Sequence, residues 1–380
     1  MKKYVKADKF YFPYSVKNEG YLEIKDGKFG RFFKSAPKNS DIIDYSGYQI
    51  APGYVDTHIH GYNGYDVMDN SPLALEEISK GILNTGVTSF LPTTLTDSFE
   101  HFLDVCKTIG EFAGNETGAR IQGIYLEGPY FTEKYKGAQN EKYMRDPSIE
   151  EFNEWQKISG GLIKKIALAP ERRGALDFIN DVTFKNIVVS LGHTNATYEE
   201  SIAAVEAGAK VWVHAFNGMR NMEHRELGVV GAMYSSSETY AELICDGHHV
   251  HPQACRILSK LKGNNKIVLI TDCMRAGGLP DGDYTLGEFP VEVNNGTARL
   301  VNSGNLAGSV LKLKDSVKNV IEWGIATPEE AIRMASLVPA LSVGIEEKCG
   351  QIKEGLLADF IVLNHDFDLV HTYLAGEYVC

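Results

Sequence analysis

The stretch PGYVDTHIHG, residues 52–61, begins with a short apolar run and ends with two histidines two positions apart. In a strand, residues at this spacing lie on one face, so we expect His58 and His60 to point one way and Ile59 the other. Further apolar runs follow, and most end in Gly, Pro, His, Asp or Glu. They begin at Thr88, Ile121, Ile163, Ile187, Lys210, Ala241 and Lys266.

Helix-like segments lie between these runs, with apolar residues three and four positions apart. The clearest are residues 73–85, 196–208 and 252–262. Eight strands alternating with helices predict an α/β fold, a parallel (β/α)8 barrel of the TIM type over residues 53–344. An open doubly wound sheet is the alternative, but no glycine-rich dinucleotide loop follows the first strand.

The two chain ends have a different pattern, with short alternating runs separated by turn residues. Examples are GYLEIKDGKFG near the beginning and HTYLAGEYV near the end. Because chain termini often lie close together, we expect residues 1–52 and 345–380 to form one small β domain beside the barrel.

Composition excludes several classes of function. The chain is 43% hydrophobic and 23% charged, which is typical of a globular protein. Its net charge of −12, without a run of Lys and Arg, argues against nucleic-acid and membrane partners but leaves room for a small anionic substrate. The six cysteines form no CxxC pair, and we see no signal peptide or membrane span. These features predict a cytoplasmic protein.

Polar residues at the predicted strand ends carry the chemical information, because barrels of this type place their active sites there. They are His58, His60, Glu127, His193, His214 and Asp272. Imidazole nitrogens and carboxylate oxygens are ligands that Zn and Fe(II) accept. Burying six such groups together without a metal would be costly. The pattern therefore predicts a divalent metal site.

Several segments, in order along the chain, closely resemble the N-acetylglucosamine-6-phosphate deacetylases of the amidohydrolase superfamily. Besides residues 52–61, they are YLEGPY from Tyr125, KGAQN from Lys136, LGHTNA from Leu191, HAFNGM from His214, DGHHV from Asp246, TDCM from Thr271, LAGS from Leu306 and GQIKEGLLADFIVLN from Gly350. Together these motifs are far more specific than the two histidines alone.

The resemblance implies hydrolysis of N-acetyl-D-glucosamine 6-phosphate to D-glucosamine 6-phosphate and acetate, by water that a divalent metal activates. It implies that Glu127, His193 and His214 hold the principal metal, Zn or Fe. Asp272 would be the catalytic acid and base. His58 and His60 match a motif that supports a second metal in some members, so one or two ions remain open.

Many superfamily members bridge two metals with a modified lysine at the end of strand four. Here that strand ends in LAPE, and Lys164 and Lys165 lie at its start. Glu127 is therefore the better candidate for a bridging ligand.

The resemblance also implies a substrate site. It assigns Arg225 and His249 to the phosphate, and it suggests a homodimer in which the arginine reaches across the interface. Gln139 takes the place of a histidine found in many similar deacetylases, so oxyanion support would come from an amide. The remaining contacts to the sugar and acyl group would be Ala138, Asn217, Gly218, Leu306, Ala307 and Gly308.

Three alternatives stay open at this point. The motifs do not exclude an N-acetylgalactosamine-6-phosphate deacetylase, whose substrate differs at one hydroxyl. Another amidohydrolase reaction, such as cyclic amide opening or nucleobase deamination, would use the same metal chemistry. A barrel that binds without catalysis is the most remote alternative, since such a protein would be expected to lose its metal ligands first.

Overall fold

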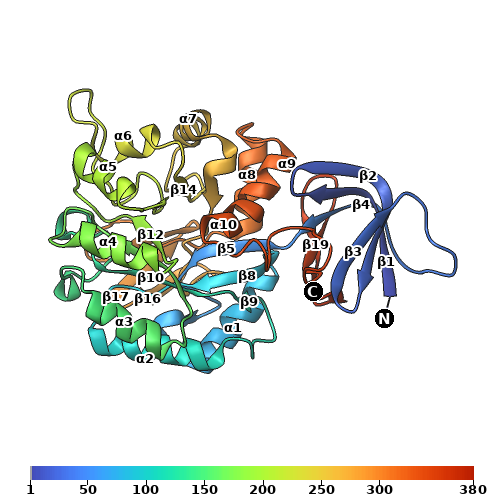
Figure 1. Ribbon diagram of the computed structural model, residues 1–380, viewed down its shortest axis with the longest axis horizontal. Coiled ribbons are helices and arrows are strands. Elements are labelled where there is room, and N and C mark those ends of the chain that lie inside the picture. The colour runs from blue at the N-terminus through green and yellow to red at the C-terminus, as the bar shows by residue number, and fades with distance from the viewer. Residues whose placement is uncertain (1) are drawn as a thin grey trace.

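The computed structural model describes residues 2–380, and its larger part is a ring of eight parallel strands surrounded by helices (Figure 1). Parallel bridges between Thr93 and Tyr125 and between Ile59 and Cys273 close the ring. The predicted barrel is confirmed, and the open doubly wound sheet is wrong. The strands are β5 (Tyr54–Ile59), β8 (Val87–Pro92), β10 (Ile124–Tyr130), β11 (Ile163–Leu168), β12 (Val188–Leu191), β13 (Val211–Trp212), β14 (Tyr240–Leu243) and β15 (Ile267–Leu269).

A helix follows each strand of the ring, and most begin at residues suited to a helix start. The side chains of Ser98, Ser148 and Thr197 accept hydrogen bonds from backbone N–H groups in the first turn. The predicted helix at 252–262 is confirmed with the same limits. The helices are α1 (Pro72–Leu83), α2 (Phe99–Phe112), α3 (Ile149–Ile158), α4 (Ala175–Phe184), α5 (Tyr198–Glu206), α6 (Gly228–Ser235), α7 (Pro252–Lys262) and α8 (Leu313–Glu322).

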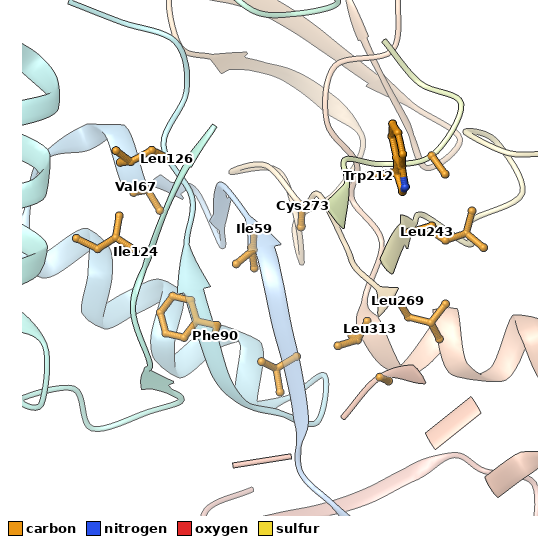
Figure 2. Close-up of a cluster of buried hydrophobic side chains, with 14 of the residues drawn as sticks. Ile59, Val67, Phe90, Ile124, Leu126, Trp212, Leu243, Leu269, Cys273 and Leu313 are labelled. Atoms are coloured by element: carbon orange, nitrogen blue, oxygen red, sulfur yellow. The ribbon is translucent and has the colours of Figure 1, made fainter. Parts of the chain in front are cut away.

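The main core fills the space between the strands and the helices. Figure 2 shows Ile59 and Phe90 within this cluster, close to the side chains of Ile124 and Leu126. Ile59 is only 1% exposed. Because successive residues of a strand point to opposite faces, Ile59 packing outward turns His58 and His60 toward the barrel interior.

The part of the chain that follows the last barrel strand covers the amino ends of the barrel strands. After α9 (Pro328–Met334) and α10 (Leu337–Ser342), residues 341–344 lie beside the starts of several strands. Val343 and Ile345 pack there in one cluster with Val55. With this end filled by apolar side chains, the carboxyl ends of the strands remain for chemistry.

A second, seven-stranded sheet lies beside the barrel and contains both chain ends (Figure 1). Its order is β21 (Glu377–Tyr378), β20 (Leu369–Leu374), β19 (Phe360–Leu363), β4 (Asp41–Pro52), β1 (Lys2–Phe12), β2 (Ser15–Lys25) and β3 (Lys28–Phe33). Phe10, Leu22 and Phe360 are fully buried in its own apolar cluster. A small β domain built from both ends is therefore confirmed, while its limits at residues 52 and 345 stay a prediction.

A three-stranded sheet near the mouth of the barrel was not predicted. Between β15 and α8 the chain forms a three-stranded antiparallel sheet of β16 (Gly282–Leu286), β17 (Phe289–Asn294) and β18 (Thr297–Leu300). The signal for it is Asn295-Gly296, both at positive φ, since this pair suits a tight hairpin turn.

None of the helices in the described chain has the length and apolar character needed to cross a bilayer.

Candidate active site

Six side chains converge at the carboxyl ends of the barrel strands, all of them buried. They are His58 and His60 from β5 and its end, Glu127 in β10, His193 after β12, His214 after β13 and Asp272 after β15. They form two compact groups, within each of which the nearest ligand atoms all lie within 4.8 Å of one another. One group is His58, His60 and Asp272, and the other is Glu127, His193 and His214.

Glu127 belongs to the second group but also contacts the histidines of the first. Its Oε1 lies 3.3 Å from Nε2 of His58 and 3.3 Å from Nε2 of His214. The same oxygen is 3.5 Å from Nε2 of His193. Its Oε2 lies 3.3 Å from Nε2 of His60. This carboxylate is thus positioned to serve both groups at once.

Each of the four histidines turns its Nδ1 toward an oxygen that accepts a hydrogen bond. The partners are the carbonyl oxygen of Thr93 for His60 at 3.2 Å, of Tyr135 for His193 at 3.0 Å and of Asn217 for His214 at 3.1 Å, and a carboxylate oxygen of Glu242 for His58 at 3.0 Å. Such oxygens receive the Nδ1 proton, so each neutral ring keeps its lone pair on Nε2. All four lone pairs then point into the cluster.

This donor set fits a divalent cation. Nε2 of His58 is buried and has no hydrogen-bond partner within residues 2–380. Nitrogen lone pairs facing carboxylate oxygens in a buried site repel one another unless a positive charge lies between them. Tetrahedral or five-coordinate Zn and Fe(II) accept this mixture of imidazole and carboxylate.

The two carboxylates of the cluster are held in their ionised form. Burial opposes ionisation of Glu127, but the positive charge that His58 carries when it is protonated and the Nε2 contacts of His193 and His214 keep its pKa well below the usual value. Burial likewise opposes ionisation of Asp272, whose pKa is nevertheless lowered by the same His58 charge and by its contact with His60. Both groups can therefore act as ligands or bases at neutral pH.

The backbone at three of these residues adopts the left-handed conformation that side chains rarely take. φ is +46° at His193, +25° at His214 and +51° at Asp272. Such conformations cost about 1–3 kcal/mol each and concentrate at functional sites. Gly218, also at positive φ, lies so close that a Cβ there would stand 2.9 Å from Nδ1 of His193. The site thus accepts local strain to aim these side chains.

A pocket of about 270 Å³ opens above the cluster. Predicted site residues that line it are His60, Glu127, Ala138, Gln139, His193, His214, Asn217, Gly218, His249, Asp272, Leu306 and Gly308. Four further lining residues were not predicted from the sequence: Leu95, Gly137, Leu286 and Asn305. Leu286 belongs to β16, so the unpredicted hairpin contributes part of the wall.

Three predicted residues lie outside the pocket lining. His58 is fully buried, and its Nε2 faces Glu127 and Asp272. Ala307 is also fully buried, and its N–H donates to the carbonyl of Ala298 instead of facing the pocket. Arg225 is exposed within residues 221–227, and within one chain the structure does not bring it to the site.

His249 and Gln139 are both oriented by fixed partners. Nδ1 of His249 lies 2.6 Å from an Asp246 carboxylate oxygen, so its Nε2 is free to face the pocket. The Gln139 carbonyl oxygen accepts the N–H of Thr96 at 2.9 Å, and its Nε2 donates to Glu127 at 2.6 Å. One amide hydrogen of Gln139 remains for a ligand.

The partner of His58, Glu242, was not predicted from the sequence either. Glu242, on β14, is fully buried and forms an ion pair with Lys165 on β11. Lys165 lies within β11, and its side chain points into the barrel. The available signal was a charged residue inside the apolar run AELIC and a pair of lysines near the start of the run IKKIALA.

Comparison with known proteins places these features in a family. Residues 50–379 match the model of the amidohydrolase family. The chain is 41% identical to an N-acetylglucosamine-6-phosphate deacetylase of Vibrio furnissii, over 90% of this chain and 86% of that one. It is 40% identical to an N-acetylgalactosamine-6-phosphate deacetylase of Escherichia coli O157:H7, over 86% of this chain and 87% of that one.

The same similarity appears among solved structures. An N-acetyl-D-glucosamine-6-phosphate deacetylase of Mycobacterium smegmatis, solved in complex with N-acetyl-D-glucosamine-6-phosphate, superposes with a TM-score of 0.93 at 29% identity. The match covers 99% of both chains. It therefore extends over the barrel, the hairpin and the seven-stranded sheet together.

Proposed function

This chain belongs to the amidohydrolase family, and from that premise we propose that it hydrolyses N-acetyl-D-glucosamine 6-phosphate to D-glucosamine 6-phosphate and acetate. The observation that carries the proposal is the convergence of four imidazole Nε2 atoms and two carboxylates at the floor of one pocket. Relatives named for this activity, at 33–41% identity, support the choice of substrate.

We propose that Glu127, His193 and His214 hold the principal divalent cation, Zn or Fe(II). His58, His60 and Asp272 offer the place for a second one. A bound cation supplies Lewis acidity, which lowers the pKa of water and polarises a carbonyl oxygen. Because Glu127 contacts both groups, it is the proposed shared ligand.

Asp272 is the proposed acid and base. Its carboxylate lines the pocket and is ionised, so it can accept a proton from the attacking water. The same group then holds that proton until the sugar nitrogen takes it as the C–N bond breaks. The free amide hydrogen of Gln139 is the proposed donor to the acyl oxygen.

The phosphate is the proposed ligand of His249 and Arg225. His249 faces the pocket from within the same chain. Arg225 does not, and the exposed side chains of Met222 and Leu227, 49% and 40% exposed, flank it. Apolar groups exposed beside a guanidinium favour a homodimer in which Arg225 completes the pocket of the partner subunit.

N-acetyl-D-galactosamine 6-phosphate is the second candidate substrate. The 40% identical relative of that name motivates it. The reacting acetamide would be the same, and only one hydroxyl would change its orientation.

The deciding experiment measures acetate release from both amino-sugar phosphates, with metal content determined on the same sample. We expect turnover of N-acetyl-D-glucosamine 6-phosphate with the higher kcat/KM. A fully metal-loaded protein without acetate release would refute the deacetylase proposal. Turnover of a cyclic amide or a nucleobase in its place would identify another amidohydrolase reaction.

A further inference from the structure

One histidine of the cluster is held differently from the other three. His60, His193 and His214 donate from Nδ1 to backbone carbonyls, which are part of the fold itself. His58 instead faces a side chain, the carboxylate of Glu242, at 3.0 Å. The orientation of His58 therefore depends on what holds Glu242.

Glu242 accepts from three donors at once. Its Oε2 receives Nδ1–H of His58 and, at 3.2 Å, the backbone N–H of His214. Its Oε1 pairs with the ammonium of Lys165. Three donors directed at its two oxygens all need an acceptor, so this side chain serves as a carboxylate with no donor of its own to offer.

Lys165 is enclosed as completely as its partner. Both side chains are 1% exposed. The ammonium also lies 3.7 Å from the ring centroid of Tyr125, a favourable position for a cation over an aromatic face. β11 and β14 are separated in the ring by β12 and β13, so the two side chains meet across the barrel interior.

The free energy of unfolding alone does not explain why this buried ion pair is present. Two charges removed from water gain little net free energy from their mutual attraction, and an apolar pair of similar size often does as well. A use that an apolar pair could not replace is the orientation of His58, since only an acceptor fixes the proton on Nδ1.

We propose that Lys165 and Glu242 are a positioning pair, which locks His58 with Nε2 toward Glu127 and Asp272 so that this group can hold the second cation. The inference rests on the proposed metal site. Without the carboxylate, the ring of His58 can carry its proton on Nε2 and then has no lone pair to give.

The variant Glu242→Gln tests the pair at nearly constant shape. An amide has one oxygen and one NH2, whereas Lys165 and His58 both require an acceptor, so one of the two meets a donor. We expect affinity for the more weakly bound cation to fall about 10- to 100-fold. The readouts are metal ions per subunit after dialysis against Zn²⁺ or Co²⁺ and the visible absorption spectrum of the Co²⁺ protein.

Glu23→Gln is the matched control, because Glu23 is also a mostly buried carboxylate paired with a lysine, Lys2, in the seven-stranded sheet far from the site. It should leave metal content unchanged. Lys165→Met leaves the buried carboxylate of Glu242 without its counter-charge. The double variant Lys165→Met/Glu242→Leu, which removes both charges, is therefore tested as well. We expect it to fold and to show the same metal loss.

Wild-type metal affinity and an unchanged Co²⁺ spectrum in the folded Lys165→Met/Glu242→Leu variant, which leaves His58 no acceptor at this position, would overturn the proposal. So would a His58→Ala variant with the metal content of the wild type, since His58 would then hold no cation. These readouts do not depend on turnover. If the wild-type protein binds metal in this manner but releases no acetate, the deacetylase proposal fails while the positioning pair stands.

Discussion

Replacing Asp272 by Asn is the most direct test of the proposed chemistry. Asn has nearly the same shape, and it tolerates the φ of +51° at this position, where Ala would add strain. The change removes the group that would take up and return the proton, while the backbone that aims it stays in place.

The expected loss follows from the double use of this carboxylate. General acid–base catalysis typically contributes about 10²- to 10⁴-fold. Because one group would serve both the attack of water and the departure of the amine, we expect a fall in kcat of about 10³- to 10⁴-fold. That corresponds to about 4–5.5 kcal/mol at roughly 1.4 kcal/mol per tenfold.

Acetate release under saturating substrate gives kcat, and substrate affinity and metal content are measured on the same preparation. Asp359→Asn is the matched control, because Asp359 is equally buried, 8% exposed, but pairs with Arg120 away from the pocket. It should alter stability and leave kcat within a few-fold. A metal-loaded Asp272→Asn protein that keeps more than a tenth of wild-type kcat would refute the acid–base assignment.

Three further results are expected. Arg225→Ala should raise the KM for the phosphorylated sugar about 10- to 100-fold, since it removes a charge-assisted hydrogen bond. The KM for N-acetylglucosamine should not change. A variant with the wild-type KM for the phosphorylated sugar would exclude Arg225 from the phosphate site. Gln139→Leu should lower kcat about 100-fold through loss of a carbonyl donor, and an unchanged kcat contradicts that role. After the metal is removed by chelation, thermal melting should show that stability falls as pH rises from about 6.5 through about 9. Burial opposes protonation of His58, but the carboxylates of Glu127, Glu242 and Asp272 raise its pKa to about 9. The metal-loaded protein should lack this slope.

Much of the architecture was predictable because it is encoded locally. The runs ending at His58 and His60, and the helix at 252–262, carry the spacing of buried strands and amphipathic helices. The hairpin of residues 282–300 was missed because its alternating pattern lies inside the range 53–344, which was assigned as a whole to the barrel. Its asparagine–glycine turn was the only strong signal.

For Arg225, the role that the motif implies differs from the position that the structure of one chain shows. The resemblance assigns it to the phosphate, yet the side chain lies in the exposed segment 221–227. Under the proposed homodimer, Arg225 would meet a phosphate in the pocket of a second subunit, and intersubunit geometry leaves no periodic pattern in the sequence. Its role stays a prediction until the kinetic test above.

The sequence by itself determined that eight strands alternate with helices and that histidines and carboxylates stand at their ends, because burial periodicity and strand-end position are local properties. The tertiary structure alone decided that Nδ1 of His58 faces Glu242 and that Lys165 reaches Glu242 from 77 positions away. Those contacts arise from the order and closure of the strands in the ring, and no residue's near neighbours in the chain specify which side chains then meet inside it.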